Sequence, residues 1–196
     1  SLDQAIEIVR RRIDEVGTNE PNILKRGNDR ILVELPGLDD PMRIKNLLGK
    51  TANLSFQFVS QKAEETFGTE KLNYDDNPDR EENVSKRIII SGENLIDAKP
   101  SMNNQTKETV VGFNLDRVGA KKFGKATSNN VGRQLAIILD KKIISAPTIS
   151  EAIVGGSGQI TGNFTFQSAT DLSLLLRSGA LPAPLNIIEE RTVGPD

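Results

Sequence analysis

The chain has 196 residues, of which 36% are hydrophobic and 27% charged, and its net charge of −2 balances 25 basic against 27 acidic residues. This composition is typical of a globular protein with one sizeable core or two small ones, and it lacks the basic excess that is common in nucleic-acid-binding proteins. Because the chain contains neither cysteine nor histidine, it cannot form a Cys/His zinc site, a cysteine nucleophile or a Ser–His–Asp triad.

The N-terminal segment predicts an amphipathic helix. Apolar residues recur at helical spacing from Leu2 to Val16, and Gly17 is a suitable C-terminal stop. Three successive arginines, residues 10–12, lie within this segment. Neighbouring positions on a helix point in different directions, so we interpret the run as a solvated flank of the helix.

The next forty residues predict two strands, a helix and a third strand. Residues 22–25 and 30–35 read as strands joined by a tight turn, and Asp40 followed by Pro41 is a favourable start for a helix that Gly49 ends. Alternating apolar residues predict a strand over 53–59. The order α-β-β-α-β is that of a split β-α-β (ferredoxin-like) fold with one strand missing.

Residues 61–87 are charged and nearly free of aliphatic side chains, so we interpret them as an exposed connecting stretch. The sequence DDNPD within it invites a calcium-loop reading. That reading fails, because Arg80 and Lys86 stand where a calcium loop requires glycine and glutamate.

A second α+β segment is predicted from residue 88 to residue 180. Strands are expected at 87–90 and 108–115, with a short helical piece between them, and Asp116 is expected to cap a helix. A hairpin follows across Asp140, with a strand at 135–139 that is apolar enough to be buried on both faces. The glycine-rich stretch 154–162 is interpreted as a bulged turn, not a phosphate loop, and a last helix is expected from Ser168, capped together with Asp171.

The stretch LLLRSGALPAPL, residues 174–185, closes this last helix with a glycine and two prolines. We predict that it is a return joint, and that residues 185–193 supply the missing strand in one sheet with 30–35 and 53–59. The predicted fold class is α+β, with a ferredoxin-like base (1–60 plus 181–196) and an inserted head (61–180). The predicted hinge candidates lie at the two crossings: Ser60, Gln61, Lys62, Ser178, Gly179 and Ala180.

The longest unbroken aliphatic run is five residues, LAIIL at 135–139, so no membrane span or signal sequence is predicted. The chain starts directly in a helix, and we expect it to be a piece of a longer protein.

Several long segments carry a family resemblance. RRRIDEVGTNEPNILKRGNDRILVELPGLDDP, LLGKTANLSF, VGFNLDRVGAKKFGKAT, LAIILDKKIISAPTI, GGSGQITGNFT and LLLRSGALPAPLNIIEERTVGP resemble, in the same order, segments of the first extracytoplasmic domain of the SecD family of protein-export translocase subunits. The resemblance covers nearly the whole chain except 61–87.

The resemblance implies a multi-pass protein of the bacterial inner membrane whose periplasmic domain, a mobile head on a base, handles unfolded preprotein during proton-gradient-assisted export. It also implies SecF, the SecYEG channel and YajC as partners. Proton-relay residues would lie in membrane helices outside this chain, so no proton-carrying residue is assigned here.

Two other functions are alternatives to this one. A porter-like domain of an RND-type small-molecule or lipid exporter would need a pocket rich in aromatic residues, but the chain has seven Phe and one Tyr. A carboxylate hydrolase would have Asp39 and Asp40 as its adjacent pair, although these residues stand where a helix cap is needed. We therefore predict no enzymatic activity and assign no catalytic, cofactor-binding or metal-binding residue. We expect weak, sequence-independent binding of unfolded chain at strand edges of the head, within residues 88–180.

Overall fold

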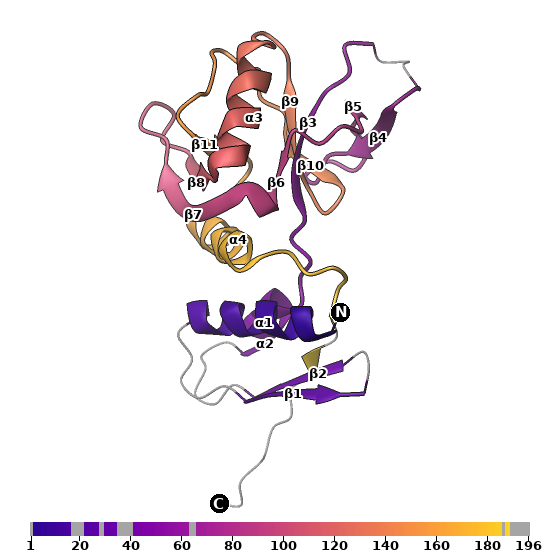
Figure 1. Cartoon of the computed structure of the whole chain (residues 1–196), viewed down its shortest axis with the longest axis vertical. Coiled ribbons are helices and arrows are strands. Elements are labelled where there is room, and N and C mark those ends of the chain that lie inside the picture. The colour runs from indigo at the N-terminus through magenta and orange to yellow at the C-terminus, as the bar shows by residue number, and fades with distance from the viewer. Residues whose placement is uncertain are drawn as a thin grey trace, which may run out of the picture. The chain divides into compact units, whose positions relative to one another are not determined.

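The computed structural model describes residues 2–16, 22–27, 30–34, 41–62, 66–185 and 187–188. The chain divides into two compact units. We call the first, Ser1–Thr51 with Ser178–Asp196, the base, and the second, Ala52–Arg177, the head. The base is therefore built from both ends of the chain and the head from its continuous middle (Figure 1).

The base combines two helices with a small sheet. Its elements are α1 (Leu2–Val16), β1 (Asn22–Arg26), β2 (Arg30–Glu34), α2 (Pro41–Leu48) and β12 (Ile187–Ile188). The sheet has the order β1-β2-β12, in which β1 is antiparallel and β12 parallel to β2. The predicted pairing of residues 185–193 with residues 30–35 is thus confirmed for Ile187 and Ile188, while residues 186 and 189–193 lie outside the described residues.

The base core lies between the helices and the sheet. Its buried members are Ala5, Ile8, Val9, Ile13, Ile31, Val33, Ile44, Leu48 and Leu181. Leu181, which follows the last helix, is completely buried. The returning chain therefore contributes to the core of the base as well as to its sheet.

The third predicted strand belongs to the head and not to the base. β3 (Leu54–Phe58) pairs along its whole length with β9 (Leu135–Leu139) and also with β6 (Ile90–Ser91). The prediction that 53–59 share a sheet with 30–35 and 185–193 is therefore wrong. The physical reason is Phe56, whose ring lies edge-on to Phe113 and Phe123 with centroids 5.6 and 5.7 Å away. A mixed α/β architecture is confirmed, whereas the ferredoxin-like arrangement of the base stays a prediction, because the described residues show three strands in the base sheet.

The head contains the remaining elements. They are β4 (Thr69–Asn73), β5 (Glu81–Ser85), η1 (Gly92–Asn94), β7 (Leu95–Met102), β8 (Thr109–Leu115), α3 (Arg117–Ser128), β10 (Lys142–Ser145), β11 (Ser157–Ile160) and α4 (Phe166–Ser178). Three sheets have the orders β10-β9-β3-β6, β11-β8-β7 and β4-β5. Strands β7 and β11 were missed by the sequence analysis, because Pro100 in one and two glycines at the start of the other resemble turn signals.

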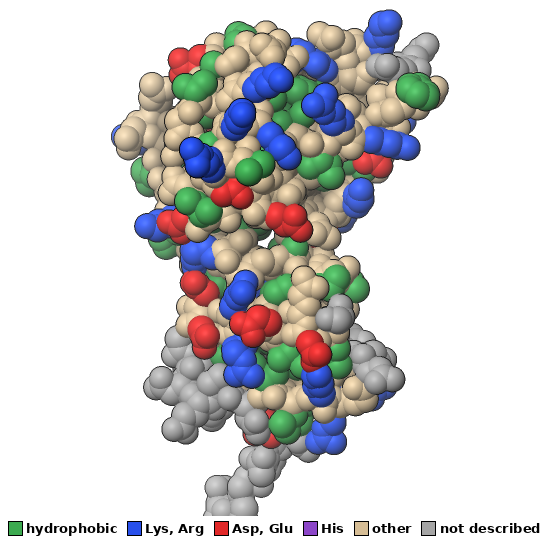
Figure 2. All heavy atoms as spheres, in the orientation of Figure 1, with side chains coloured by type: hydrophobic (Ala, Val, Ile, Leu, Met, Phe, Trp, Pro, Cys, Tyr) green, Lys and Arg blue, Asp and Glu red, His purple; other side chains and the backbone are tan. Residues whose placement is uncertain are grey.

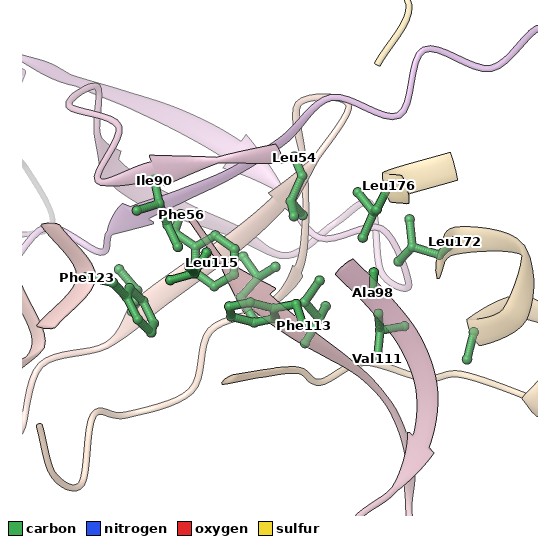
Figure 3. Packing of buried hydrophobic residues seen from close by; sticks show 14 of the residues in the cluster. Leu54, Phe56, Ile90, Ala98, Val111, Phe113, Leu115, Phe123, Leu172 and Leu176 are labelled. Carbon is green, nitrogen blue, oxygen red and sulfur yellow. The ribbon is translucent and has the colours of Figure 1, made fainter. Parts of the chain in front are cut away.

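The main core of the head joins the two larger sheets to α3 and α4 (Figure 3). Phe56, Phe113 and Phe123 form an aromatic group within this core, and α4 contributes Leu172 and Leu176 to the same core. Gly158 on β11 is required here, because a Cβ at this position would lie 2.6 Å from the tip of the Phe113 ring.

Strand β9 is buried on both faces, as predicted. Ile137 belongs to the main head core, and its neighbour Ile138 belongs to a second cluster under the β4–β5 hairpin. Leu72, Tyr74 and Val84 are the apolar side chains that this hairpin contributes to the second cluster. The prediction that 61–87 form an exposed stretch is wrong for these residues, because a few apolar side chains at strand spacing suffice to cover one face of a sheet.

Local signals at turns and caps are confirmed in part. Asp140 and Lys141 have φ of 50° and 68° in the predicted hairpin, and the Asp116 carboxylate accepts a hydrogen bond from Gly119 N at 2.6 Å. The helix expected from Ser168 begins instead at Phe166. Thr165 and Ser168 form its capping box, with each hydroxyl accepting from the other residue's backbone N–H at 3.0 Å.

Candidate functional site

The chain passes between the two units at two places, Thr51–Ala52 and Arg177–Ser178. The predicted return crossing at Ser178–Ala180 begins at the second of these. The predicted outgoing crossing at Ser60–Lys62 lies nine residues inside the head instead, where Ser60 N donates to Asn83 O at 2.8 Å. The outgoing crossing comes earlier than predicted because β3 is already paired within the head from Leu54 onward.

Arg12 holds both crossings on the base side. Its guanidinium Nη1 donates to Lys50 O at 2.6 Å and to Leu48 O at 3.0 Å, just before the chain leaves the base. Its Nη2 donates to Gly179 O at 2.8 Å and its Nε to Ser178 Oγ at 3.2 Å, where the chain returns. One side chain thus joins the end of the outgoing segment to the start of the returning segment.

Because Arg12 is buried, its guanidinium depends on these hydrogen bonds. The residue is 0% exposed, and a guanidinium removed from water must have its donors satisfied. The interpretation of residues 10–12 as a solvated flank is correct for the exposed Arg10 and Arg11 but wrong for Arg12. Arg12 follows Ala5 and Val9 along the buried face of α1, and this helical spacing was the signal that could have identified it.

The outgoing crossing is confined to a single residue. On the base side, Thr51 O accepts from Leu181 N at 2.9 Å. On the head side, Asn53 N donates to Asp140 Oδ1 at 2.9 Å, and Asp140 N donates to Asn53 O at 2.8 Å. Ala52 lies between these two anchors with φ of 53°, a backbone conformation that is uncommon for a residue with a side chain.

The return crossing is equally short. Arg177 Nη1 donates to Ala98 O at 2.6 Å within the head, and the next residue, Ser178, accepts from Arg12 within the base. Gly179, with φ of 103°, then ends α4, as the sequence predicted. Ser178 and Gly179 are therefore anchored to the base, whereas Arg177, one residue earlier, is anchored to the head.

Lysine and arginine side chains gather over α3 on the face of the head shown in Figure 2. The helix contributes the exposed side chains of Arg117, Lys121, Lys122 and Lys125 and has no acidic residue in its first turn.

Among the described residues, no group of three or more Asp, Glu, His and Cys side chains is arranged to hold a metal ion. No helix in the described ranges is long and apolar enough to span a membrane.

Comparisons with known proteins match both parts of the chain. Residues 2–61 match the profile of "Protein translocase subunit SecDF, P1 domain, N-terminal", and residues 69–183 match that of "SecDF, P1 head subdomain". The protein translocase subunit SecD of Rickettsia felis is 48% identical over 99% of this chain. The chain spans about two fifths (39%) of the length of that relative.

Solved structures agree with this match. A chain from a crystal structure of SecDF in a "Super-membrane-facing form" has a TM-score of 0.79 at 31% identity, covering 94% of this chain and 27% of that one. A second structure, of SecDF described as a membrane component that enhances protein export, has a TM-score of 0.77 at 31% identity and covers 98% of this chain and 93% of that one.

Proposed function

Because the chain belongs to the SecD family of protein translocase subunits and matches its P1 domain over nearly its whole length, we propose that its head turns on its base while the parent protein draws preprotein outward. The parent protein would be a multi-pass inner-membrane subunit with this domain on the periplasmic face. It would act with SecF and YajC beside the SecYEG channel and use the proton gradient. The porter-like alternative is not favoured by these relatives.

The observation that carries the proposal is the shortness of the two crossings. Each unit anchors the chain up to the crossing with its own hydrogen bonds, through Arg12 in the base and through Asp140 and Arg177 in the head. Hinges of moving domains are typically a few element-end residues that absorb the backbone rotation. We therefore propose Ala52 and the Arg177–Ser178 link as the pivots, in place of Ser60, Gln61, Lys62 and Ala180.

Cross-linking in the full-length protein tests the motion. Because this chain has no cysteine, Glu7→Cys in the base and Lys121→Cys in the head introduce two labelling sites on exposed helix positions. Spin labels on the pair would report the distribution of distances between the units. A bismaleimide that contains a reducible disulfide, matched in length to that distribution, would then join them.

We expect cross-linking to slow preprotein export and reduction of the linker to restore it. The matched control is a pair within the head, Lys71→Cys and Lys141→Cys, which should leave export unchanged when cross-linked. Normal export with the base–head linker demonstrably in place would show that head motion is not part of the mechanism.

A further inference from the structure

The head sheet β11-β8-β7 has two edge strands, and hydrogen bonds fix which backbone groups of each point outward. Asn103 N donates to Glu108 O at the end of β7–β8, and Leu115 N donates to Gly156 O at the start of β8–β11. Hydrogen-bonded and non-hydrogen-bonded pairs alternate along antiparallel strands. With the observed registers, the outward N–H and C=O groups belong to residues 98, 100 and 102 on β7 and to residues 157 and 159 on β11.

The β7 edge is covered by its own side chains. Ala98 N donates to Asp97 Oδ1 at 2.9 Å, and Ala98 O accepts from Arg177 at 2.6 Å. Pro100 has no N–H to offer, and a register shift between Leu95 and Asp97 distorts the strand start. Proline, charged side chains and bulges are the usual means by which natural sheets block pairing with another chain.

The β11 edge has none of these features. Its four residues, Ser157–Ile160, include no proline, no charged side chain and no register shift. Ser157 Oγ donates to Asn114 Oδ1 and Gln159 Oε1 accepts from Asn103 Nδ2, so both side chains bond within the sheet region. In the part of the chain that the structure describes, the outward backbone groups of the exposed Ser157 and Gln159 have no hydrogen-bond partner.

We infer that the β11 edge binds an extended segment of unfolded polypeptide by adding it as a further strand. This inference rests on the proposed export function and gives it a binding site. Two outward residues provide two donors and two acceptors, which complement the backbone of any extended chain irrespective of its side chains. Such recognition suits a protein that must handle many different preproteins.

The size of the edge favours a transient guest over a second copy of this chain. Four residues of strand span only about 13 Å, and the few net hydrogen bonds that they can form each add little to the affinity in water. A stable dimer usually buries at least about 1,200 Å², more than a pairing of two such short edges provides. Weak binding with rapid release is the expected behaviour.

The test is an NMR titration of the 196-residue chain with a synthetic decapeptide of alternating Thr and Val. We expect millimolar-range binding, with the largest amide shifts and slowed hydrogen exchange at Ser157 and Gln159. The same peptide N-methylated at every residue should bind at least about fivefold more weakly, because neither of its two edges keeps backbone donors. Shifts confined to β6, β10 or the base, or equal binding of the methylated peptide, would overturn the inference.

Gln159→Pro removes an outward donor without removing a ladder bond, as Pro100 does on β7. We expect it to weaken peptide binding about three- to tenfold, the effect of one lost hydrogen bond and local exclusion, whereas Gln159→Ala should bind as wild type. If Gln159→Pro does not fold, the hydrogen exchange of Ser157 and Gln159 in the wild type shows whether the peptide binds at the β11 edge.

Two further outcomes also count against the inference. Dimerisation through β11 without peptide, seen as concentration-dependent line broadening, would assign the edge to a second copy. No binding at millimolar peptide would remove the site. Neither outcome alters the cross-linking test, so failure of this site and failure of the proposed function are distinguishable.

Discussion

The base and the head each form a hydrophobic core, but they assemble it from differently connected segments of the chain. The head is continuous from Ala52 to Arg177 and packs two hydrophobic clusters against opposite faces of one sheet. The base is assembled from both chain ends, and its core is completed by Leu181, which follows the entire head in sequence. The head should therefore be able to fold without the base, whereas the base depends on the return of the chain.

Truncation after Arg177 should produce the largest effect. It removes Leu181 from the base core, β12 from the base sheet and two acceptors from Arg12. We expect residues 2–51 to unfold while the head retains its structure, measured by amide dispersion in NMR spectra. The matched fragment 52–177 should fold alone, and a folded base in the truncated chain would contradict the comparison.

Phe113→Ala should destabilise the head selectively. Phe113 is buried at the centre of the aromatic group, with Phe56 and Phe123 at 5.6 and 6.3 Å. Loss of a buried phenylalanine costs about 3–5 kcal/mol, so the unfolding transition of the head should shift while base resonances persist. Phe67→Ala, at a residue that is 91% exposed, is the matched control. Simultaneous loss of both units would mean that they unfold cooperatively.

Arg12→Met should act on the base and on its crossings. The variant keeps an apolar stem but leaves the carbonyls of Lys50, Leu48 and Gly179 without their donor. A buried acceptor that loses its partner costs about 1–3 kcal/mol, and the bond to Leu48 is buried while those to Lys50 and Gly179 are part-buried, so we expect the base to lose about 2 kcal/mol or more of stability. Chemical denaturation followed at base and head resonances would measure this difference.

Arg11→Met is the control for that variant, because Arg11 is exposed on the same helix and, among the described residues, forms an ion pair with Glu7 alone, at 3.8 Å. Arg11→Met should leave the unfolding transitions of the base and of the head unchanged. If spin labels also show a broader distribution of base–head distances in Arg12→Met, then Arg12 limits rotation as well as stabilising the base. An unchanged distribution would assign it a purely structural role.

The smallest effect is expected at the surface pair of Asp3 and Lys25 in the base. A hydrogen bond and the charge of Lys25 lower the pKa of the Asp3 carboxyl below its ordinary value of 3.8. The pair can stabilise the folded base at a pH above the ordinary pKa of 3.8, and this stabilisation is lost as the pH falls through the lowered pKa of Asp3. Both side chains are more than half exposed, so solvent screens the pair.

We expect Lys25→Met to return the NMR titration midpoint of Asp3 towards 3.8 without a measurable change in stability at neutral pH. Lys71→Met, which breaks the exposed 3.9 Å pair with Glu81 in the head, should leave the Asp3 midpoint unchanged. A clear loss of base stability in Lys25→Met would show that this pair matters more than its exposure suggests.

Features that depend on neighbouring residues could be predicted from the sequence alone. The helical face of α1, the Asp116 cap, the hairpin at Asp140 and the stop at Gly179 were all predicted, because periodicity, caps and turn conformations act within a few residues. The resemblance to SecD segments also followed from sequence, and the matching family profiles confirm it.

The pairing of strands into sheets and the burial of polar groups could not be predicted in this way, because both depend on residues far apart in the sequence. Alternating apolar residues make 53–59 a strand, but its partner β9 lies about eighty residues away and was not encoded in that alternation. The sequence pattern of Arg12 does not differ from that of its two neighbours, because its hydrogen-bond partners lie 35 to 167 residues away. The two edges of the β11-β8-β7 sheet likewise differ through contacts from other elements, such as Arg177 on β7, because long-range packing and not local pattern determines which backbone groups remain unpaired.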